Sequence, residues 1–215
     1  SKDGLLSTSA SFSTTDLSTG FHRITFKVKD NDTLWSVAKI SSVFINDISV
    51  ASIDSISPQV AYRNNLTYYT VLFYGNVSDN DGQITHYYWN SSKEDDELST
   101  SGNFSVNVNT LSHGNHTISF QGRDNYTTWS PEVSSWLIVK EYPNASIDSQ
   151  SAYSIDFSDL ITLSGSGSDG DGSITDYEWI SSRDGLLSRS SSFSTTELSV
   201  GFHSVTLKVK DDNGL

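Results

Sequence analysis

The chain has 215 residues, with 13 Lys or Arg against 26 Asp or Glu and a net charge of −13 at pH 7. This balance argues against nucleic acid and anionic membranes as partners, because both require a cationic surface. Cysteine is absent, which excludes disulfides and thiolate metal sites. No apolar run approaches the roughly 20 residues of a membrane span. There is also no signal peptide or initiator methionine, so we expect a mature internal segment without membrane insertion.

The first predicted strand begins at Gly20 and runs to Asp30, in the sequence GFHRITFKVKD. Apolar and polar side chains alternate along it, which is typical of a strand with one buried and one solvent-facing side. Residues 37–45 supply the last strand of this part of the chain. The side expected to be buried consists of His22, Ile24, Phe26 and Val28.

The middle of the chain contains a predicted strand with Tyr87 and Trp89 on one side, which we expect to face the core. A large aromatic residue on a central strand fills the space between the two sheets of a sandwich that has no disulfide. The strand that follows Gly114 alternates less strictly, with Gly122 at its last inward position. Residues 133–139 supply the last strand.

The last part of the chain repeats the first. The sequence SKDGLLSTSASFSTTDLSTGFHRITFKVKD at 1–30 returns as SRDGLLSRSSSFSTTELSVGFHSVTLKVKD at 182–211, and a diverged copy occupies 92–124. The repeat period, measured below between aligned glycines, is close to the roughly 100 residues of an immunoglobulin-type sandwich. The aligned glycines lie 94 and then 87 residues apart, at Gly20, Gly114 and Gly201.

These patterns predict an all-β fold of tandem immunoglobulin-like β-sandwich domains. Residues 51–143 form one complete repeat. Residues 1–50 form the C-terminal half of a preceding repeat, and residues 144–215 form the N-terminal part of a third one without its last strand. We therefore expect a longer array, in a filament or stalk, or ends that neighbouring molecules complete.

Three successive motifs resemble the PKD (polycystic-kidney-disease) repeat, in its prokaryotic surface-protein form: Asp-x-Asp-Gly-x-Ile, Tyr-x-Trp, and a Gly-x-His strand ending in Lys-Val-Lys-Asp. The resemblance implies an Ig-like sandwich used for adhesion, spacing or surface coats, without catalysis. The chain departs from the family after the tryptophan, where an acidic run at 93–97 replaces the usual turn. The matching residues are Asp79, Asp81, Gly82, Ile84, Tyr87 and Trp89 in the middle repeat, and Asp169, Asp171, Gly172, Ile174, Tyr177 and Trp179 in the third.

Two short loops place alternating carboxylates together: Asp-Asn-Asp-Gly at 79–82 and Asp-Gly-Asp-Gly at 169–172. A second acidic loop follows each alternating strand, and in a sandwich both loops can converge at one end. Since Ca²⁺ takes six to eight oxygen ligands, we predict calcium sites here. The alternative is that these residues form turns by bonding to their own backbone. The predicted ligands are Asp79, Asp81, Asp124, Asp169, Asp171 and Asp211.

Asn-x-Ser/Thr occurs eight times, with six occurrences in the middle repeat, and this enrichment predicts covalent N-glycans. The alternative is that a Ser- and Thr-rich sequence produces such sites by chance. The predicted sites are Asn31, Asn65, Asn76, Asn90, Asn103, Asn115, Asn125 and Asn144. Exposed aromatic side chains can stack on sugar rings of a polysaccharide or of the protein's own glycans; the candidates are Tyr68, Tyr69, Tyr88, Trp136 and Tyr142.

The histidines do not form a metal or catalytic set. His22, His116 and His203 occupy one repeated strand position and are expected to define the fold by reaching a loop through a ring nitrogen. His86 and His113 stand alone and make no ligand set. No Gly-x-Ser-x-Gly, phosphate-binding glycine loop or His-Glu-x-x-His is present, so we predict that the chain is not an enzyme.

Two functions remain. The first is a non-catalytic structural segment of an extracellular or cell-surface protein, assembling head to tail with copies of itself or with other surface proteins. The second is a carbohydrate-binding or adhesion module, or an appendage of a secreted hydrolase, that binds polysaccharide.

Overall fold

The structure is a computed structural model that describes residues 2–63 and 69–215, and it confirms the all-β expectation. Among these residues the helical content is limited to the short turn η1 (Val108–Thr110), and no helix is long and apolar enough to span a bilayer. Backbone contacts divide the chain into two compact units. The first comprises Ser1–Ile56, Phe73–Phe104 and Thr117–Ser135, and the second comprises Ser57–Leu72, Ser105–His116 and Trp136–Leu215.

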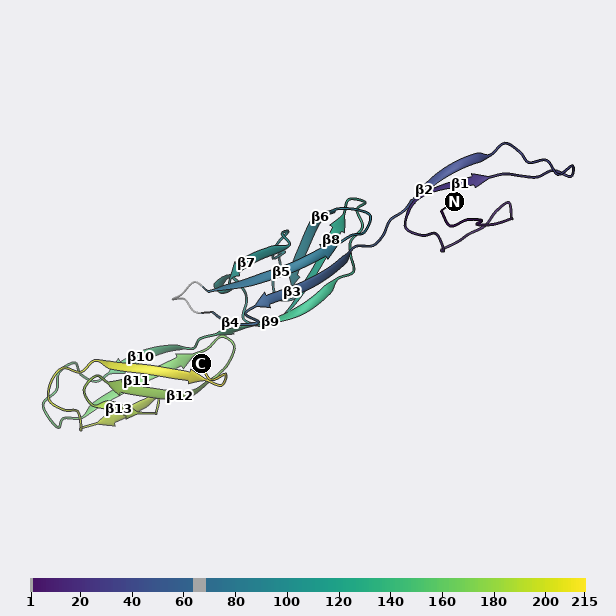
Figure 1. The fold of residues 1–215 in the computed structure, drawn as a ribbon. Coiled ribbons are helices and arrows are strands. Elements are labelled where there is room, and N and C mark those ends of the chain that lie inside the picture. Colours follow the sequence, from purple (N-terminus) through teal and green to yellow (C-terminus); the bar gives the residue numbers. More distant parts are fainter. Residues whose placement is uncertain (1, 64–68) are drawn as a thin grey trace. The chain divides into compact units, whose positions relative to one another are not determined.

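The first unit begins with a two-stranded antiparallel sheet of β1 (Gly20–Phe26) and β2 (Lys39–Ile45), shown in Figure 1. The predicted buried side of this strand is only partly correct. His22 is buried, but Phe26 is 48% exposed and Val28 is also exposed, because within the described residues no second sheet covers them.

The middle repeat contains two sheets, with strand orders β3-β5-β7 and β4-β9-β8-β6. Strands β6 and β8 pair antiparallel, from Ile84 opposite Asp124 to Ser91 opposite Ile118, whereas β4 and β9 pair in parallel. The strands are β3 (Val50–Ser57), β4 (Val60–Arg63), β5 (Thr70–Ser78), β6 (Ile84–Ser91), β7 (Asn103–Asn107), β8 (Gly114–Asp124) and β9 (Val133–Glu141).

Aromatic rings from both sheets meet in the core of the first unit. Phe73 of β5 stacks on Phe104 of β7 with ring centroids 4.6 Å apart, and Trp89 of β6 stacks on Phe120 of β8 at 4.2 Å. Phe73 and Trp89 also meet edge to face at 5.8 Å. Trp89 is fully buried, as predicted from its strand position. The core therefore joins the two sheets into a sandwich.

A glycine permits this close aromatic packing. A Cβ atom on Gly75 would lie 2.5 Å from the Trp89 ring and 2.7 Å from the Phe120 ring. The absence of a side chain on β5 at this position lets the rings fill the space between the sheets.

The second unit contains a similar sandwich, with sheets β10-β11-β14 and β13-β12-β15. Its core is Leu163, Trp179 and Leu207, and Phe193 packs against the Trp179 ring at 5.7 Å. The Trp179 indole nitrogen donates to the carbonyl of Ser190 at 3.0 Å. These strands are β10 (Asn144–Gln150), β11 (Ile161–Ser168), β12 (Ile174–Ser181), β13 (Gly185–Ser188), β14 (Ser192–Thr195) and β15 (Val205–Asp211).

Candidate cation sites at two acidic loops

The first acidic site lies in the first unit and consists of Asn46, Asp47, Asp79, Asp81 and Asp124. Asn46 and Asp47 come directly after β2, the two following aspartates stand in the loop after β5, and Asp124 ends β8. The backbone N–H of Asp47 donates to Asp81 Oδ2 at 3.0 Å, and the Asn46 amide donates to Asp124 Oδ2 at 2.7 Å. The residues after β2 therefore connect the two acidic loops that the sequence suggested could converge.

Asp124 has a turn-forming role of its own. Its Oδ1 accepts from the backbone N–H groups of Tyr126 and Thr128, both at 2.8 Å. Burial raises its pKa, but these hydrogen bonds and the one from Asn46 outweigh burial and lower the pKa overall. Asp211 repeats the turn by accepting from the N–H of Leu215 at 2.7 Å. The turn-forming alternative thus accounts for one oxygen of each of these carboxylates.

Other oxygens of the first site have no such role. Asn46 Oδ1, Asp79 Oδ2 and Asp81 Oδ1 are buried and have no hydrogen-bond partner among the described residues. A Cβ on Gly82 would lie 2.5 Å from Asn125 Oδ1 and 3.0 Å from Asp79 Oδ2, so the loop oxygens close around the glycine. A buried carboxylate oxygen without a donor is costly unless a positive charge compensates it.

The second acidic site lies in the second unit and consists of Glu141, Asp169, Asp171 and Asp211. The backbone N–H of Glu141, at the end of β9, donates to Asp171 Oδ1 at 3.0 Å. The Glu141 carboxylate also lies over the loop, since a Cβ on Gly170 would approach its Oε2 within 2.5 Å. Glu141 and Asp47 are 94 residues apart, which is the repeat period, so the same contact recurs in both units.

Asp169 and Asp211 are the most confined carboxylates of the second site. Both oxygens of Asp169 and the Oδ2 of Asp211 are buried without a partner among the described residues, and Asp211 is 1% exposed. Burial raises the pKa of Asp169, and the nearby charges of Asp171 and Asp211 raise it further. Asp171 and Asp211 therefore both lie close enough to Asp169 to disfavour its ionised form.

This chemistry suits a hard cation, because the site offers oxygens only. Within residues 2–63 and 69–215, no three carboxylate or imidazole groups already stand in metal-binding positions. A cation would therefore have to draw the carboxylates together. The structure places Asp79, Asp81 and Asp124 in one site and Asp169, Asp171 and Asp211 in the other. Sequence reasoning missed Asn46, Asp47 and Glu141, although the 94-residue step between the last two was a visible signal.

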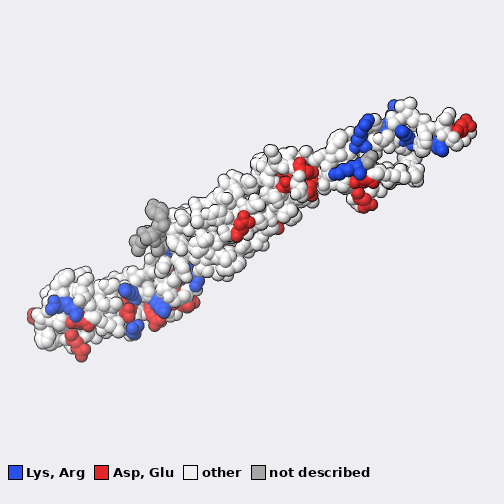
Figure 2. Space-filling model, viewed as in Figure 1, with Lys and Arg blue, Asp and Glu red and all other residues white. Residues whose placement is uncertain are grey.

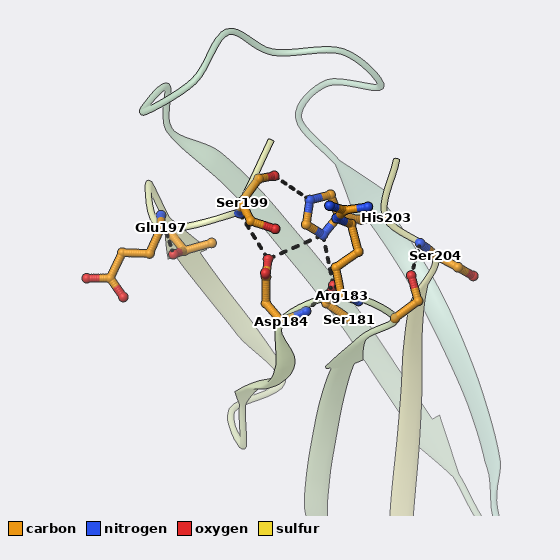
Figure 3. A network of polar contacts seen from close by, with 9 residues as sticks. Ser181, Arg183, Asp184, Glu197, Ser199, His203 and Ser204 are labelled. Atoms are coloured by element: carbon orange, nitrogen blue, oxygen red, sulfur yellow. Dashed lines mark hydrogen bonds and ion pairs between the residues drawn. The ribbon is translucent and has the colours of Figure 1, made fainter. Parts of the chain in front are cut away.

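A serine, a histidine and an aspartate also meet in the third repeat, as Figure 3 shows, but they form a structural clamp. His203 donates from Nε2 to the carbonyl of Ser199 at 2.6 Å, and its Nδ1 lies 2.8 Å from Ser181 Oγ and 3.3 Å from Asp184 Oδ2. Ser181 and Asp184 both contact Nδ1 of His203, and Nε2 of the same ring is hydrogen-bonded to the backbone. No nitrogen is left to relay a proton from the serine to a substrate.

The hydrogen bond from the histidine Nε2 to a backbone carbonyl recurs in each repeat and confirms the role expected of the repeated histidine. His22 reaches the carbonyl of Ser18 at 2.6 Å, and His116 reaches that of Ser112 at 2.8 Å. In each case the partner lies four residues upstream. The clamp therefore fastens the loop before the strand.

The predicted glycosylation sites are mostly at the surface. Asn90 is half-buried, and Asn65 and the candidate Tyr68 lie outside the described residues. Asn103 Oδ1 accepts from the N–H of Gly75 at 3.1 Å and Asn125 Oδ1 from that of Gln83 at 2.7 Å, which leaves each Nδ2 unused by these contacts. The exposed sites are Asn31, Asn76, Asn103, Asn115, Asn125 and Asn144.

The sequence matches no known family profile. It is 25% identical over 181 residues to the pre-pro-metalloprotease PrtV of Vibrio cholerae, a match that covers 84% of this chain and 19% of that protein. The chain thus spans about a fifth of the length of the curated relatives it matches.

Solved structures with a similar fold include fibronectin(III)-like modules of Clostridium thermocellum CbhA, at 12% identity and a TM-score of 0.33 over 77% of this chain and 87% of that one. Carbohydrate-binding modules of the β-sandwich superfamily match at 14% and 0.37, over 75% and 84%. Three N-terminal domains of the outer capsid protein Hoc of bacteriophage RB49 match at 20% and 0.34, over 80% and 58%.

Proposed function

We propose that the chain is a non-catalytic structural segment of an extracellular or cell-surface protein, built from PKD-type immunoglobulin-like repeats. The observation that carries this proposal is the contact found in both acidic sites. Asp47 donates its N–H to Asp81, and Glu141 donates its N–H to Asp171, each at 3.0 Å. In both cases a residue at the end of the last strand of one repeat, or two residues beyond it, is fastened to the first acidic loop of the next. A regular connection of this kind is what a spacer or fibre needs.

Repeated connections also support assembly. Head-to-tail contacts between like domains extend without limit when the rotation between them does not close a ring. The partners proposed here are copies of the chain or other surface proteins. Electron microscopy of native material is expected to show regular fibres or a lattice whose spacing equals one or a few repeats. Short single rods at every protein concentration would contradict this proposal.

Each acidic site is further proposed to hold a calcium ion. The first site would supply Asp79, Asp81 and the Oδ1 atom of Asn46, and the second would supply Asp169, Asp171 and the Oδ2 atom of Asp211. The support is the set of buried oxygens without donors, which a divalent cation would satisfy. The cation would also offset the burial and the repulsion from Asp171 and Asp211 that raise the pKa of Asp169.

Thermal unfolding with EDTA and with calcium tests the cation proposal. A ligand present at a hundred times its dissociation constant stabilises the folded state by about 2.7 kcal/mol, so calcium is expected to raise Tm by several degrees. Asp171→Asn should remove the part of the calcium-dependent rise in Tm that the second site contributes. Asp95→Asn deletes the same charge from an exposed position outside both sites and serves as the control. An equal calcium shift in all three proteins would exclude the cation sites but not the structural role.

The exposed sequons are proposed to carry N-glycans. Attachment forms a bond between Asn Nδ2 and the anomeric carbon of a glycosyl diphosphate donor, displaces the diphosphate and releases one amide proton. The Oδ1 atom keeps its acceptor role, so the contacts of Asn103 and Asn125 with the backbone can persist after modification. Mass spectrometry of peptides from native protein would show which sites are occupied.

A binding module is the second candidate, favoured by an aromatic and cationic cluster on the surface of the first unit. Trp129 meets the Tyr88 ring edge to face at 6.3 Å, and the Arg123 guanidinium lies 5.4 Å from the centroid of Trp129. Exposed aromatic rings of this kind can bind sugars. Retention of the chain on insoluble polysaccharide, lost in Trp129→Ala, would favour this function. The match to part of a metalloprotease fits an appendage of a larger enzyme.

A further inference from the structure

Three of the eight sequons share a pattern that the other five lack. In each, a tyrosine stands two residues before the asparagine and the third sequon position is serine. Tyrosine makes up 10 of the 215 residues, so chance would place it there in fewer than one of eight sequons. The three sites read Tyr74-Gly-Asn76-Val-Ser, Tyr88-Trp-Asn90-Ser-Ser and Tyr142-Pro-Asn144-Ala-Ser; the other five carry Lys29, Arg63, Ser101, His113 and Arg123 at that position.

Strand geometry places the tyrosine and the asparagine on one face of the sheet at two of the three sites, Tyr74 with Asn76 in β5 and Tyr88 with Asn90 in β6. At the third site Tyr142 follows the end of β9 and Asn144 begins β10. Side chains two residues apart in a strand point to the same side and are separated by about 7 Å. In β5 the exposed pair Tyr74 and Asn76 alternates with the buried residues Phe73 and Val77. This distance matches the span from an asparagine side chain to the first sugar attached to it.

The face of β5 is suited to a sugar. Tyr74 is 43% exposed, and the face of β3, β5 and β7 in Figure 2 shows few charged side chains. No other aromatic ring stacks on Tyr74 within the described part of the chain.

The other two tyrosines are held in place by neighbouring rings. Tyr88 meets Trp129 edge to face, with 71° between the ring planes. Tyr142 lies tilted against Tyr62 with centroids 5.8 Å apart, and it remains 41% exposed. A ring already held by a neighbour loses little conformational freedom when a ligand packs on it.

We propose that Tyr74, Tyr88 and Tyr142 each form a stacking platform for the first sugar of a glycan attached to the asparagine two residues later. The apolar C–H face of a pyranose ring packs on the aromatic ring and excludes water from it. This inference rests on the proposed glycosylation and adds to it a specific role for each tyrosine. It also gives a reason for three large aromatic side chains near the surface: each would contact a sugar attached to the same chain.

The Tyr74 site allows the cleanest test, because Tyr74 has no ring partner to lose among residues 2–63 and 69–215. The chain would be secreted from a host that attaches N-acetylglucosamine and then trimmed enzymatically to one sugar per site. In the glycosylated chain Tyr74→Thr, which retains a strand-forming residue, is expected to lower Tm by about 2–6 °C. The same substitution in an Asn76→Gln background should lower Tm by much less.

Asn103 supplies a matched control on the neighbouring strand β7. It is an exposed sequon with Ser101 in place of the tyrosine. The effect of Ser101→Thr on Tm should be the same with and without the Asn103 glycan. NMR gives a second readout, since ring protons of the Asn76-linked sugar should move upfield in the unaltered chain and return to ordinary shifts in Tyr74→Thr.

The outcomes separate the two proposals. If native protein carries no sugar on Asn76, Asn90 and Asn144, both glycosylation there and stacking are excluded. If the sugars are present but Tyr74→Thr has the same effect on Tm with and without the Asn76 glycan, glycosylation stands and stacking is wrong. Binding of a separate polysaccharide to the Asn76→Gln chain, lost on Tyr74→Thr, would assign the tyrosine to an external ligand and overturn the inference.

Discussion

At the scale of single residues, the carboxylates differ in their structural roles. Asp184 accepts hydrogen bonds from Ser199, which together with the nearby His203 lower its pKa, so it serves a loop. Asp169 lies near other carboxylates, and burial and the charges of Asp171 and Asp211 raise its pKa more than the nearby backbone N–H groups of Gly170 and Asp171 lower it. A buried carboxylate such as Asp169 destabilises the folded chain unless a positive charge compensates its own charge, and a bound cation would supply that charge.

The raised pKa of Asp169 makes a prediction with a defined sign. Without calcium, its ionised form is disfavoured in the folded state, so its contribution to stability is present at low pH and is lost as pH rises through the raised pKa. Asp169→Asn should therefore have a higher Tm than the unaltered chain at pH 7 in EDTA.

The difference between these two proteins should shrink as pH falls towards the ordinary aspartate pKa of 3.8. With saturating calcium the order should reverse at pH 7, because the substitution removes a ligand. A lower Tm for Asp169→Asn at pH 7 in EDTA would contradict the assignment. Comparing the two proteins cancels the contribution of every other titrating group that they share.

At the scale of strands, the sandwich depends on how closely two sheets can approach. Gly75 on β5 faces the Trp89 and Phe120 rings, and the corresponding Gly165 on β11 faces Leu207 and Trp179. The absence of a side chain at these positions makes room for the large residue that replaces a disulfide in the core.

Gly75→Ala tests this interpretation. The added methyl group would overlap two rings whose positions are set by their neighbours, so the free energy of unfolding should fall by about 1–3 kcal/mol. Urea unfolding followed by tryptophan fluorescence measures the change.

Gly102→Ala is the control for Gly75→Ala. Its Cβ would come no closer than 3.4 Å to any neighbour, which is ordinary contact. The expected change is within about 0.5 kcal/mol. Equal effects of the two substitutions would show that backbone flexibility, rather than packing, determines the cost.

At the scale of the whole molecule, the repeat produces two equivalent acidic sites in two separate compact units. The two sites share no residue, and sites without shared partners are expected to behave independently. Equilibrium dialysis should therefore find two calcium ions per chain. Asp81→Asn and Asp171→Asn should each remove one, and the double variant should remove both. Loss of both ions through either single substitution would contradict independent sites.

The sequence by itself determined the all-β class, because alternation in strands such as 205–211 and the repeated tryptophan leave few other ways to bury apolar side chains. It also identified the acidic loops and the sequons, since these are local patterns. Its expectation for the strand after Gly20 was partly wrong, because burial of Phe26 and Val28 requires a second sheet to cover them.

Only the tertiary structure decided which residues meet. Asp47 and Asp81 are 34 residues apart, and the contact between them follows from the path of the chain rather than from any local motif. The structure likewise showed that Asp211 Oδ1 forms a turn while its Oδ2 has no partner. The physical reason is that local sequence sets the conformation of a strand or turn, whereas burial and pairing depend on segments brought together by the fold.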